Sequence, residues 1–223
     1  MLSKFISCEQ FGFMEGRQIH EAIGVSHEGL HSLKTKKLKG VVIKIELSKA
    51  YDRVCWLYLR MLLTHLGFEI DFIWWIMACI SSISFVVLIN GSASPFFYAE
   101  RELRQGYPSS PLLFLLVVEG LKHFLNQAKR GGGFKGIPIS NVLYISHLLF
   151  VDEILIFCDG SCKDIDKLCE GLDLLQVATG IVINVHKYFV TCSNLRDVEA
   201  RYLVSKLLFQ VGDLDVGLKY LGF

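Results

Sequence analysis

The sequence predicts an α+β fold whose sheet is largely antiparallel, and three observations support this prediction. Residues 41–48 (VVIKIELS) alternate apolar and polar side chains, as in a strand with one packed face. Residues 148–158 (LLFVDEILIFC) form two apolar halves around a short acidic turn, which is typical of a hairpin. The predicted helices and strands follow one another without the even βαβ rhythm of a parallel, doubly wound sheet. The length of 223 residues and the 52% hydrophobic content are ample for a core and exclude a disordered chain.

The first elements are a helix, a strand and a second helix. Residues 17–33 place apolar side chains at helical spacing, and the lysines of 34–39 suit the negative end of the helix dipole. Gly40 is a stop signal for this helix. The strand at 41–48 follows, and Tyr51 to Gly67 is predicted to be helical.

Residues 72–89 are uncharged and about the minimum length for a membrane-spanning helix. Three serines interrupt this segment, and its last six residues (SFVVLI) favour a strand. We therefore predict a buried helix at Phe72–Cys79 followed by a buried strand, with a small membrane-associated protein as a much weaker alternative. Asn90-Gly91 is a strong hairpin turn signal, and residues 96–100 are the predicted returning strand.

The second half continues the mixture of elements. The loop at 104–111 leads through two prolines into a very apolar helix that runs to about Ala128. After the acidic hairpin, a helix is predicted over residues 163–179, and Gly180 caps it. Residues 181–185 (IVINV) continue as a strand.

Composition and cysteine usage restrict the function only loosely. The net charge of +1 argues against a strongly basic nucleic-acid binder on average, although a local basic groove is compatible with a neutral total. The seven cysteines are scattered, odd in number and without a CxxC pair, which favours free thiols in a reducing compartment. The first ten residues lack the features of a signal peptide. We therefore expect an intracellular location, in the cytoplasm or the nucleus.

Three carboxylates stand out against this apolar background. Glu46 lies on the polar face of a predicted strand, and Asp152-Glu153 lies at the tip of the apolar hairpin. Buried carboxylates are costly unless they are paired or bound to a metal, and their oxygens are ligands of hard divalent cations. Two such ions about 3.5–4 Å apart stabilise the attacking and leaving oxygens of an in-line phosphoryl displacement. The alternative is that the tip is solvated and that Glu46 pairs with a lysine such as Lys44 or Lys49.

Five motifs follow one another along the chain: KIELSKAYD (44–52), RELRQGYPSSPLLF (101–114), HLLFVDEILIF (147–157), GIVINVHK (180–187) and KYLGF (219–223). QFGFMEGRQI (10–19) precedes them. In this order the five resemble the successive motifs of reverse transcriptases, in particular those of the non-LTR (LINE-type) retrotransposons common in plants, and QFGFMEGRQI resembles the preceding fingers motif. The resemblance covers essentially the whole chain and implies a right-hand polymerase fold. Residues 1–40 would be partial fingers, and residues 41–223 the palm through the start of the primer grip, without a thumb.

The resemblance also implies roles for single residues. Glu46, Asp152 and Glu153 occupy the positions of the catalytic carboxylates that bind two Mg²⁺ ions. Lys187 resembles the lysine near the nucleotide phosphates, a candidate general acid for pyrophosphate departure. Tyr51 falls where a bulky ring lies under the incoming sugar and excludes a 2′-hydroxyl. The alternatives are that Tyr51 is a core residue and that Lys187 is a solvated charge.

The same motifs imply two further groups of functional residues. Arg104, Gln105 and Gly106 resemble the loop that lies against the nucleotide and template, where glycine permits close backbone approach. The start of the primer grip would be Tyr220, Leu221 and Gly222, and the alternative is a plain edge strand. The implied partners are an RNA template, a DNA primer and dNTP, without a membrane.

The chain departs from the family pattern at its predicted site. Glu46 and Glu153 stand where the family has aspartates, so each carboxylate is one methylene longer. Tyr107 replaces an acid, Ser109 replaces an apolar residue, and Glu102 replaces a glycine. Magnesium requires near-ideal octahedral geometry, and a misplacement of about 1 Å can cost roughly 10²-fold in rate. These departures predict reduced or lost polymerase activity, and the competing hypothesis is a catalytically silent palm that binds nucleic acid.

Overall fold

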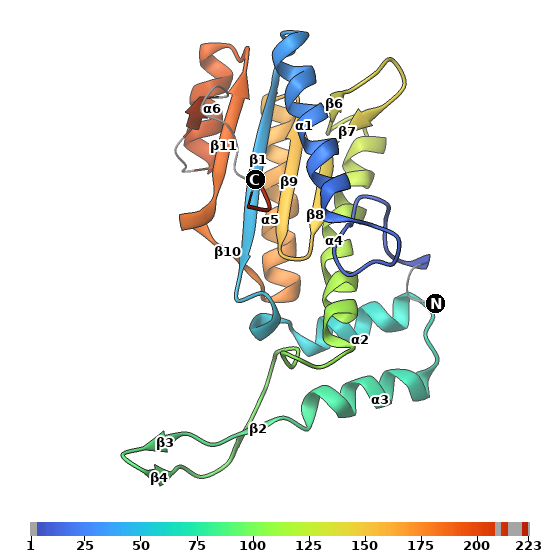
Figure 1. Cartoon of the computed structure of the whole chain (residues 1–223), viewed down its shortest axis with the longest axis vertical. Coiled ribbons are helices and arrows are strands. Elements are labelled where there is room, and N and C mark those ends of the chain that lie inside the picture. The colour runs from blue at the N-terminus through green and yellow to red at the C-terminus, as the bar shows by residue number, and fades with distance from the viewer. Residues whose placement is uncertain (1–3, 208–210, 214–219, 223) are drawn as a thin grey trace.

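A central sheet organises the computed structural model, which describes residues 4–207, 211–213 and 220–222 (Figure 1). The strand order is β12 (Val211–Asp213), β11 (Phe189–Ser193), β1 (Gly40–Ser48), β9 (Glu153–Cys158) and β8 (His147–Phe150), and β10 (Val182–Ile183) pairs with the end of β1. The β11–β12 pair is parallel, whereas β1 pairs antiparallel with β9, β10 and β11, and β8 pairs antiparallel with β9. This arrangement confirms the predicted α+β class and its mainly antiparallel sheet.

Helices cover both faces of this sheet. Figure 1 shows α1 (Ile19–Thr35) on one face, and α4 (Ser110–Arg130) and α5 (Cys162–Thr179) on the other. Because successive side chains point to opposite faces, β1 and β9 supply both layers. Ile43 and Ile156 pack in the cluster with α4 and α5, and Val42 and Phe157 pack in the cluster with α1. All four side chains are fully buried, so the predicted strand at 41–48 has a partly covered second face as well.

Most predicted helices form, with differences at their ends. The α4 helix begins with a proline in its first turn, and α5 begins after Ser161, whose hydroxyl accepts the Asp164 amide. Gly180 ends α5 with a φ of +76°, as predicted. Gly40 is not the end of α1, which was a wrong prediction: α1 stops at Thr35, and Gly40 already belongs to β1. A Cβ at Gly40 would lie 2.7 Å from the Leu33 side chain, so glycine allows α1 to pack on β1.

The predicted helix over residues 51–67 is divided in two. A 3₁₀ turn at Tyr51–Arg53 precedes α2 (Trp56–His65), and the backbone at Cys55 is extended. The Cys55 amide donates to the Thr179 carbonyl oxygen at 2.8 Å, which attaches this break to the end of α5. Tyr51 therefore lies outside α2, in the preceding 3₁₀ turn.

A projecting hairpin follows α3 (Ile70–Ser81), and we call residues 83–99 the arm (Figure 1). Its strands are β2 (Ser84–Phe85) paired with β5 (Phe97–Tyr98) and β3 (Leu88–Ile89) paired with β4 (Ser92–Ala93). The predicted turn is confirmed, since Asn90 and Gly91 join β3 to β4 with φ values of +50° and +83°.

The predicted burial of this region was wrong. In α3 only Ile73 and Ile80 are buried, while Trp75 is 69% exposed. In the arm, Leu88 is 73% exposed. None of the helices in the described ranges combines the length and the apolar character that a membrane crossing requires. The remaining elements are β6 (Ile137–Pro138), β7 (Tyr144–Ile145), α6 (Asp197–Leu207) and a 3₁₀ turn at Val185–Lys187. The predicted strand over 181–185 was therefore too long, since only Val182–Ile183 pair in the sheet.

Candidate active site

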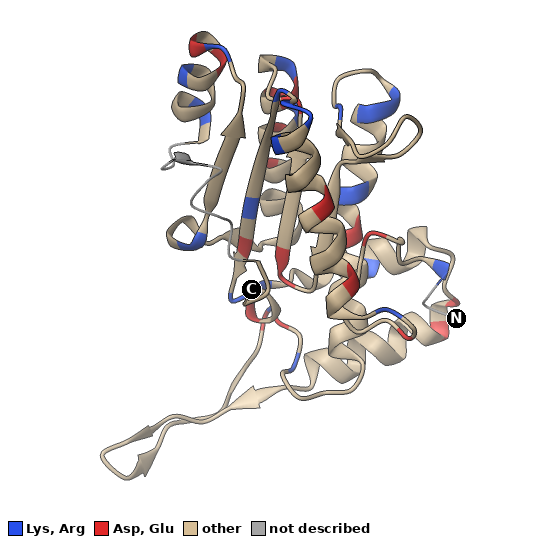
Figure 2. Cartoon of the chain, turned by 45° about the horizontal axis from the view of Figure 1, so that its top comes forward, with Lys and Arg blue, Asp and Glu red and all other residues tan. Residues whose placement is uncertain are grey.

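The three predicted carboxylates meet at one end of the central sheet. The antiparallel register places Glu46 of β1 directly opposite Glu153 of β9, and Asp152 lies in the turn just before β9. The Leu47 amide donates to the Asp152 carbonyl oxygen at 2.9 Å, which joins this turn to β1. Figure 2 shows acidic segments next to each other at the ends of two neighbouring central strands. The side chains of Glu46 and Glu153 are only 18% and 23% exposed.

Two lysines compensate the negative charge of the two glutamates. Like charges directly opposite on neighbouring strands are destabilising. The Nζ atom of Lys187 lies 2.6 Å from Oε1 of Glu46, and Nζ of Lys44 lies 3.3 Å from Oε2 of Glu153. Glu46 therefore has a lysine partner 141 positions away, one that the sequence alternative did not name.

The electrostatics of the cluster leave an excess of negative charge. Burial is the largest cause that raises the pKa of Asp152, and repulsion from Glu46 and Glu153 raises it further, against a backbone hydrogen bond. The hydrogen bond to Glu46, with the charge of that carboxylate, raises the pKa of Lys187. Three carboxylates face two lysines, and one more positive charge would lower the repulsion at Asp152.

The donor set fits a hard divalent cation in chemistry and charge, since carboxylate oxygens are the ligands that such ions take. Within residues 4–207, 211–213 and 220–222, no three His, Cys, Asp or Glu side chains are arranged closely enough to hold an ion. Glu46 and Glu153 are instead each paired with a lysine. To bind these carboxylates, a cation would have to displace Lys187 from Glu46 and Lys44 from Glu153.

A cavity of about 500 Å³ contains most of the predicted nucleotide-binding residues. It is lined by Phe13, Tyr51, Gln105, Gly106, Tyr107, Pro108, Ser110 and Pro111. The Tyr51 ring stacks on Phe114, with ring centroids 4.8 Å apart, and it is half-buried. Burial and then the charge of Asp152 raise the pKa of Tyr51, so this ring lies within electrostatic reach of the carboxylates.

The loop on the other side of the cavity is fixed to the first motif. Nε2 of Gln105 donates to Oδ1 of Asp52 at 2.9 Å. Gly106 has a φ of +80° with open space around it, which a glycine adopts without steric cost. Arg104 is exposed and is not one of the residues that line the cavity. The structure thus brings Tyr51, Gln105 and Gly106 together and leaves Arg104 outside.

The predicted primer-grip residues lie against the carboxylate end of the sheet. Tyr220 is 3% exposed and packs in the cluster on the α1 side. The Leu221 amide donates to Oε2 of Glu153 at 3.3 Å. Leu221 and Gly222 have φ values of +53° and +90° and form a turn, so the alternative of a plain edge strand was wrong. Their role in holding a primer stays a prediction.

The sequence of the chain matches the model of one protein family. The family model described as "Reverse transcriptase (RNA-dependent DNA polymerase)" matches residues 1–223, the whole chain. The chain belongs to this family.

Individual relatives refine the assignment of this reverse transcriptase domain. It is 27% identical over 139 residues to the retrovirus-related Pol polyprotein from the type-1 retrotransposable element R2 of Popillia japonica, covering 61% of this chain and 22% of that protein. It is 42% identical over 67 residues to an uncharacterized mitochondrial protein of Arabidopsis thaliana, covering 30% of this chain and 55% of that one. These matches support the predicted LINE-type, plant-like resemblance. The domain spans between about a fifth and just over half of the length of these relatives.

A solved structure supports the fold. The telomerase of Candida albicans, in complex with a TWJ fragment of telomeric RNA, superposes with a TM-score of 0.58 at 13% identity. The match covers 81% of this chain and 31% of the telomerase. At this identity the likeness shows the fold alone, and it confirms the palm-type architecture. Reverse transcriptases generally use divalent metal ions, which agrees with the donor chemistry of the carboxylate cluster.

Two residues that approach the reverse transcriptase site were not assigned to it from the sequence. Phe13 lines the Tyr51 cavity, with a φ of +53° and 58% exposure. Gln10 contacts the turn that carries Asp152. Both belong to the motif QFGFMEGRQI, and an aromatic residue directly after Gly12 was the available signal for Phe13. Nothing local in the sequence indicated which part of the sheet this motif would reach.

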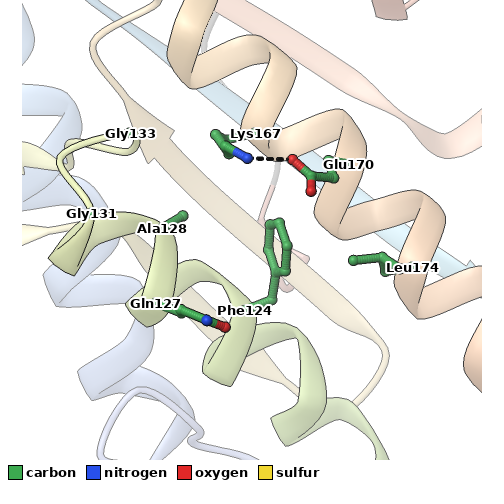
Figure 3. A pocket seen from close by; sticks show the side chains of 8 residues that line it. All are labelled: Phe124, Gln127, Ala128, Gly131, Gly133, Lys167, Glu170 and Leu174. Atoms are coloured by element: carbon green, nitrogen blue, oxygen red, sulfur yellow. Dashed lines mark hydrogen bonds and ion pairs between the residues drawn. The ribbon is translucent and has the colours of Figure 1, made fainter.

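A second cavity, of about 410 Å³, lies between α4 and α5 (Figure 3). Phe124 points from α4 toward α5, and Lys167 pairs with Glu170 across one turn of α5 at 2.6 Å. None of the predicted site residues of the reverse transcriptase lines this cavity. This cavity is therefore separate from the candidate site at the carboxylate end of the sheet.

Proposed function

We propose that this domain catalyses RNA-templated addition of dNTP to a DNA primer for a LINE-type retrotransposon, at a reduced rate in this copy. The observation that carries the proposal is the meeting of Glu46, Asp152 and Glu153 at the sheet end beside the Tyr51 cavity. The family assignment supplies the reaction class, and the paired lysines supply the reason for the reduced rate.

Glu46, Asp152 and Glu153 are the residues that would hold two Mg²⁺ ions, which supply activation of the primer hydroxyl and stabilisation of the leaving pyrophosphate. The Tyr51 ring, supported by Phe114, forms a rigid wall of the cavity and would exclude a 2′-hydroxyl. Gly106 leaves space for close approach of a nucleotide to the loop backbone. These residues would bind and orient the substrate.

The lysine pairs explain why the rate would be low. Each glutamate is one methylene longer than the aspartate of the family pattern, and each carboxylate contacts a lysine. Metal binding would therefore compete with two ion pairs. Lys187 is held at Glu46 with a raised pKa, so it gives up a proton less readily as a general acid.

Primer extension on an RNA template with Mg²⁺ tests the proposal. We expect the triple variant Glu46→Asp/Tyr107→Asp/Glu153→Asp to extend the primer roughly 10²-fold faster than the natural sequence. The same triple variant with Asp152→Asn is the matched negative control and should not extend. Equal turnover of the natural sequence and the triple variant would contradict the reduced rate. Absence of extension by the triple variant would contradict the polymerase function itself.

The second candidate function is a catalytically silent palm that binds nucleic acid. The ion pairs of both glutamates favour it, because each one engages a carboxylate that a metal ion would need as a ligand. Such a protein would bind primer–template with an affinity that falls with salt concentration, but would not extend it. Calorimetric titration of the natural sequence with Mg²⁺ separates the candidates further, since a slow polymerase should bind Mg²⁺ and a silent palm should not.

A further inference from the structure

The motif QFGFMEGRQI lies against the edge of the sheet at β8, next to the carboxylate turn. Gln10 is fully buried and forms an isolated parallel bridge with Leu149. The Phe11 amide donates to the Leu149 carbonyl oxygen at 2.9 Å, and the Leu149 amide donates to the Glu9 carbonyl oxygen at 2.8 Å. These bonds extend the sheet by one short segment from the N-terminal part of the chain.

The Gln10 side chain reaches the turn between β8 and β9. Its Oε1 atom accepts the amide of Gly12 at 2.9 Å and the amide of Val151 at 3.2 Å. Both partners are N–H donors, so the carbonyl oxygen of the amide must face them. Val151 directly precedes Asp152, the carboxylate at the centre of the candidate site.

The turn that Gln10 holds has an unfavourable backbone conformation. Val151 has a φ of +56°, a region that β-branched residues rarely adopt. Such conformations persist only where the surrounding structure determines them. A Cβ on Gly12 would lie 2.4 Å from Cγ2 of Val151 and 3.0 Å from its nitrogen, so only glycine permits this contact. On its other side the turn is bonded by the Leu47 amide.

The N-terminal segment is itself held in place. The Arg17 guanidinium donates to the carbonyl oxygens of Ser7 and Gln10, which closes the loop between them. The Ser7 amide and hydroxyl donate to Oε1 of Glu119 on α4, at 3.1 Å and 2.8 Å. Residues 7–17 therefore connect α4 to the turn that carries Asp152.

We propose that Gln10 is a positioning residue, which fixes the backbone of the β8–β9 turn and through it the place of Asp152. It acts through the Val151 amide and does not reach the cavity that Tyr51 lines. Its consequence for polymerisation rests on the proposed function, whereas its effect on the turn does not.

Amide hydrogen exchange on the full chain tests the positioning directly. The Gln10→Met variant keeps the size of the side chain and removes the acceptor, so protection of the Val151 amide should fall about tenfold or more. Gln10→Glu retains an acceptor oxygen in its neutral form, which burial favours, and should restore protection. The matched control is Ser7→Ala, which loosens the same segment at α4 but touches no atom of the turn, and should leave Val151 unchanged.

Two outcomes would overturn the proposal: Val151 protection in Gln10→Met within about twofold of the natural sequence, or an equal loss at the β1 and β9 amides. The second result would make Gln10 an ordinary core residue. If Gln10→Met does not fold, the same comparison is made in a Val151→Gly background, because glycine adopts the φ of +56° without strain.

Primer extension gives a second measurement. In the Asp-restored triple variant, adding Gln10→Met should lower kcat about tenfold or more with little change in KM for dNTP, and Gln10→Glu should recover part of the loss. An unchanged kcat would contradict positioning of Asp152. If the triple variant itself is inactive, the proposed function fails, and the exchange experiment alone decides the role of Gln10.

Discussion

The carboxylate end of the sheet and the arm are both built from strongly apolar sequence, yet they differ in nearly every physical respect. At the sheet end, Ile154, which follows Glu153, is fully buried, and the turn before β9 is bonded from two sides. In the arm, Leu88 and Phe96 are each 73% exposed. Residues 72–99 contain no charged side chain, and Figure 2 shows the arm without any acidic or basic segment. Apolar sequence therefore becomes core only where other elements cover it.

Coverage accounts for this difference. The sheet is covered by α1 on one face and by α4 and α5 on the other, so most side chains of β1 and β9 are buried. The arm is a hairpin whose two ladders each pair only two residues per strand. An isolated two-stranded hairpin is marginally stable in water. The folding free energy should therefore come from the sheet and its helices, and little of it from the arm.

Replacing one phenylalanine by alanine in each region compares their contributions to the free energy of unfolding. Phe157→Ala should lower the free energy of unfolding by about 3–5 kcal/mol, because it leaves a cavity between β9 and α1. The ring also fills the space beside Gly29, where a Cβ would lie 2.8 Å from it. Phe96→Ala, the matched control in the arm, should change stability by less than about 0.5 kcal/mol. Urea unfolding followed by circular dichroism gives both values, and comparable losses would mean that the arm is part of the core.

The pH dependence of stability should come from the body of the domain, that is, the sheet and its helices, and not from the arm. Glu199 of α6 is buried, with Arg196 at 2.6 Å and Lys39 at 3.0 Å. The hydrogen bond from Arg196 is the largest cause that lowers the pKa of Glu199 from 4.5 to about 2. A lowered carboxyl pKa stabilises the fold above pH 4.5, and this contribution disappears as the pH falls toward 2.

Glu199→Gln should therefore lower the free energy of unfolding at pH 7 by about 1.5–3 kcal/mol and flatten its decline between pH 4.5 and pH 2. Denaturant titrations at several pH values measure this slope. An unchanged slope in the variant would assign the acid sensitivity to other carboxylates. The arm contains no carboxylate, so substitutions there should leave the slope as it is.

The point where the chain returns from the arm to the body carries a strained residue. Glu102 has a φ of +114°. Two hydrogen bonds hold this conformation: the Glu102 amide donates to the Val54 carbonyl oxygen, and the Trp56 indole donates to the Glu102 carbonyl oxygen. Burial and the charge of Asp52 raise the pKa of Glu102 as well. Glu102→Gly should stabilise the fold by about 1 kcal/mol, since glycine adopts this φ freely. Thermal unfolding measures the gain, and a loss of stability would mean that the Glu102 side chain has a favourable contact.

Local pattern predicted the elements of the sheet end well. The alternation in β1 and the acidic tip between β8 and β9 follow from side-chain period and turn chemistry, which neighbouring residues determine. The turn at Asn90-Gly91 and the cap at Gly180 were predicted for the same reason. The family resemblance then assigned Glu46, Asp152 and Glu153 to one site, and the register of β1 and β9 places them together.

The remaining features depend on contacts between distant parts of the chain. The pairing of Lys187 with Glu46 and the contact of Gln10 with Val151 each span 141 positions. No local period indicates such partners. The exposure of Trp75 was missed for a related reason, because hydrophobicity describes a residue and not the elements that cover it.

The smallest effect should come from placing a charge at the tip of the arm. Leu88→Lys should change the free energy of unfolding by less than about 0.5 kcal/mol, because this side chain is already mostly in water. The same change should raise solubility, since charged residues on exposed strand edges oppose edge-to-edge pairing between chains. Light scattering against protein concentration measures the second effect, with Ser92→Thr as a neutral control in the opposite strand. A stability loss of about 2 kcal/mol or more in Leu88→Lys would show that the arm folds against the body, and the contrast between the two regions would then disappear.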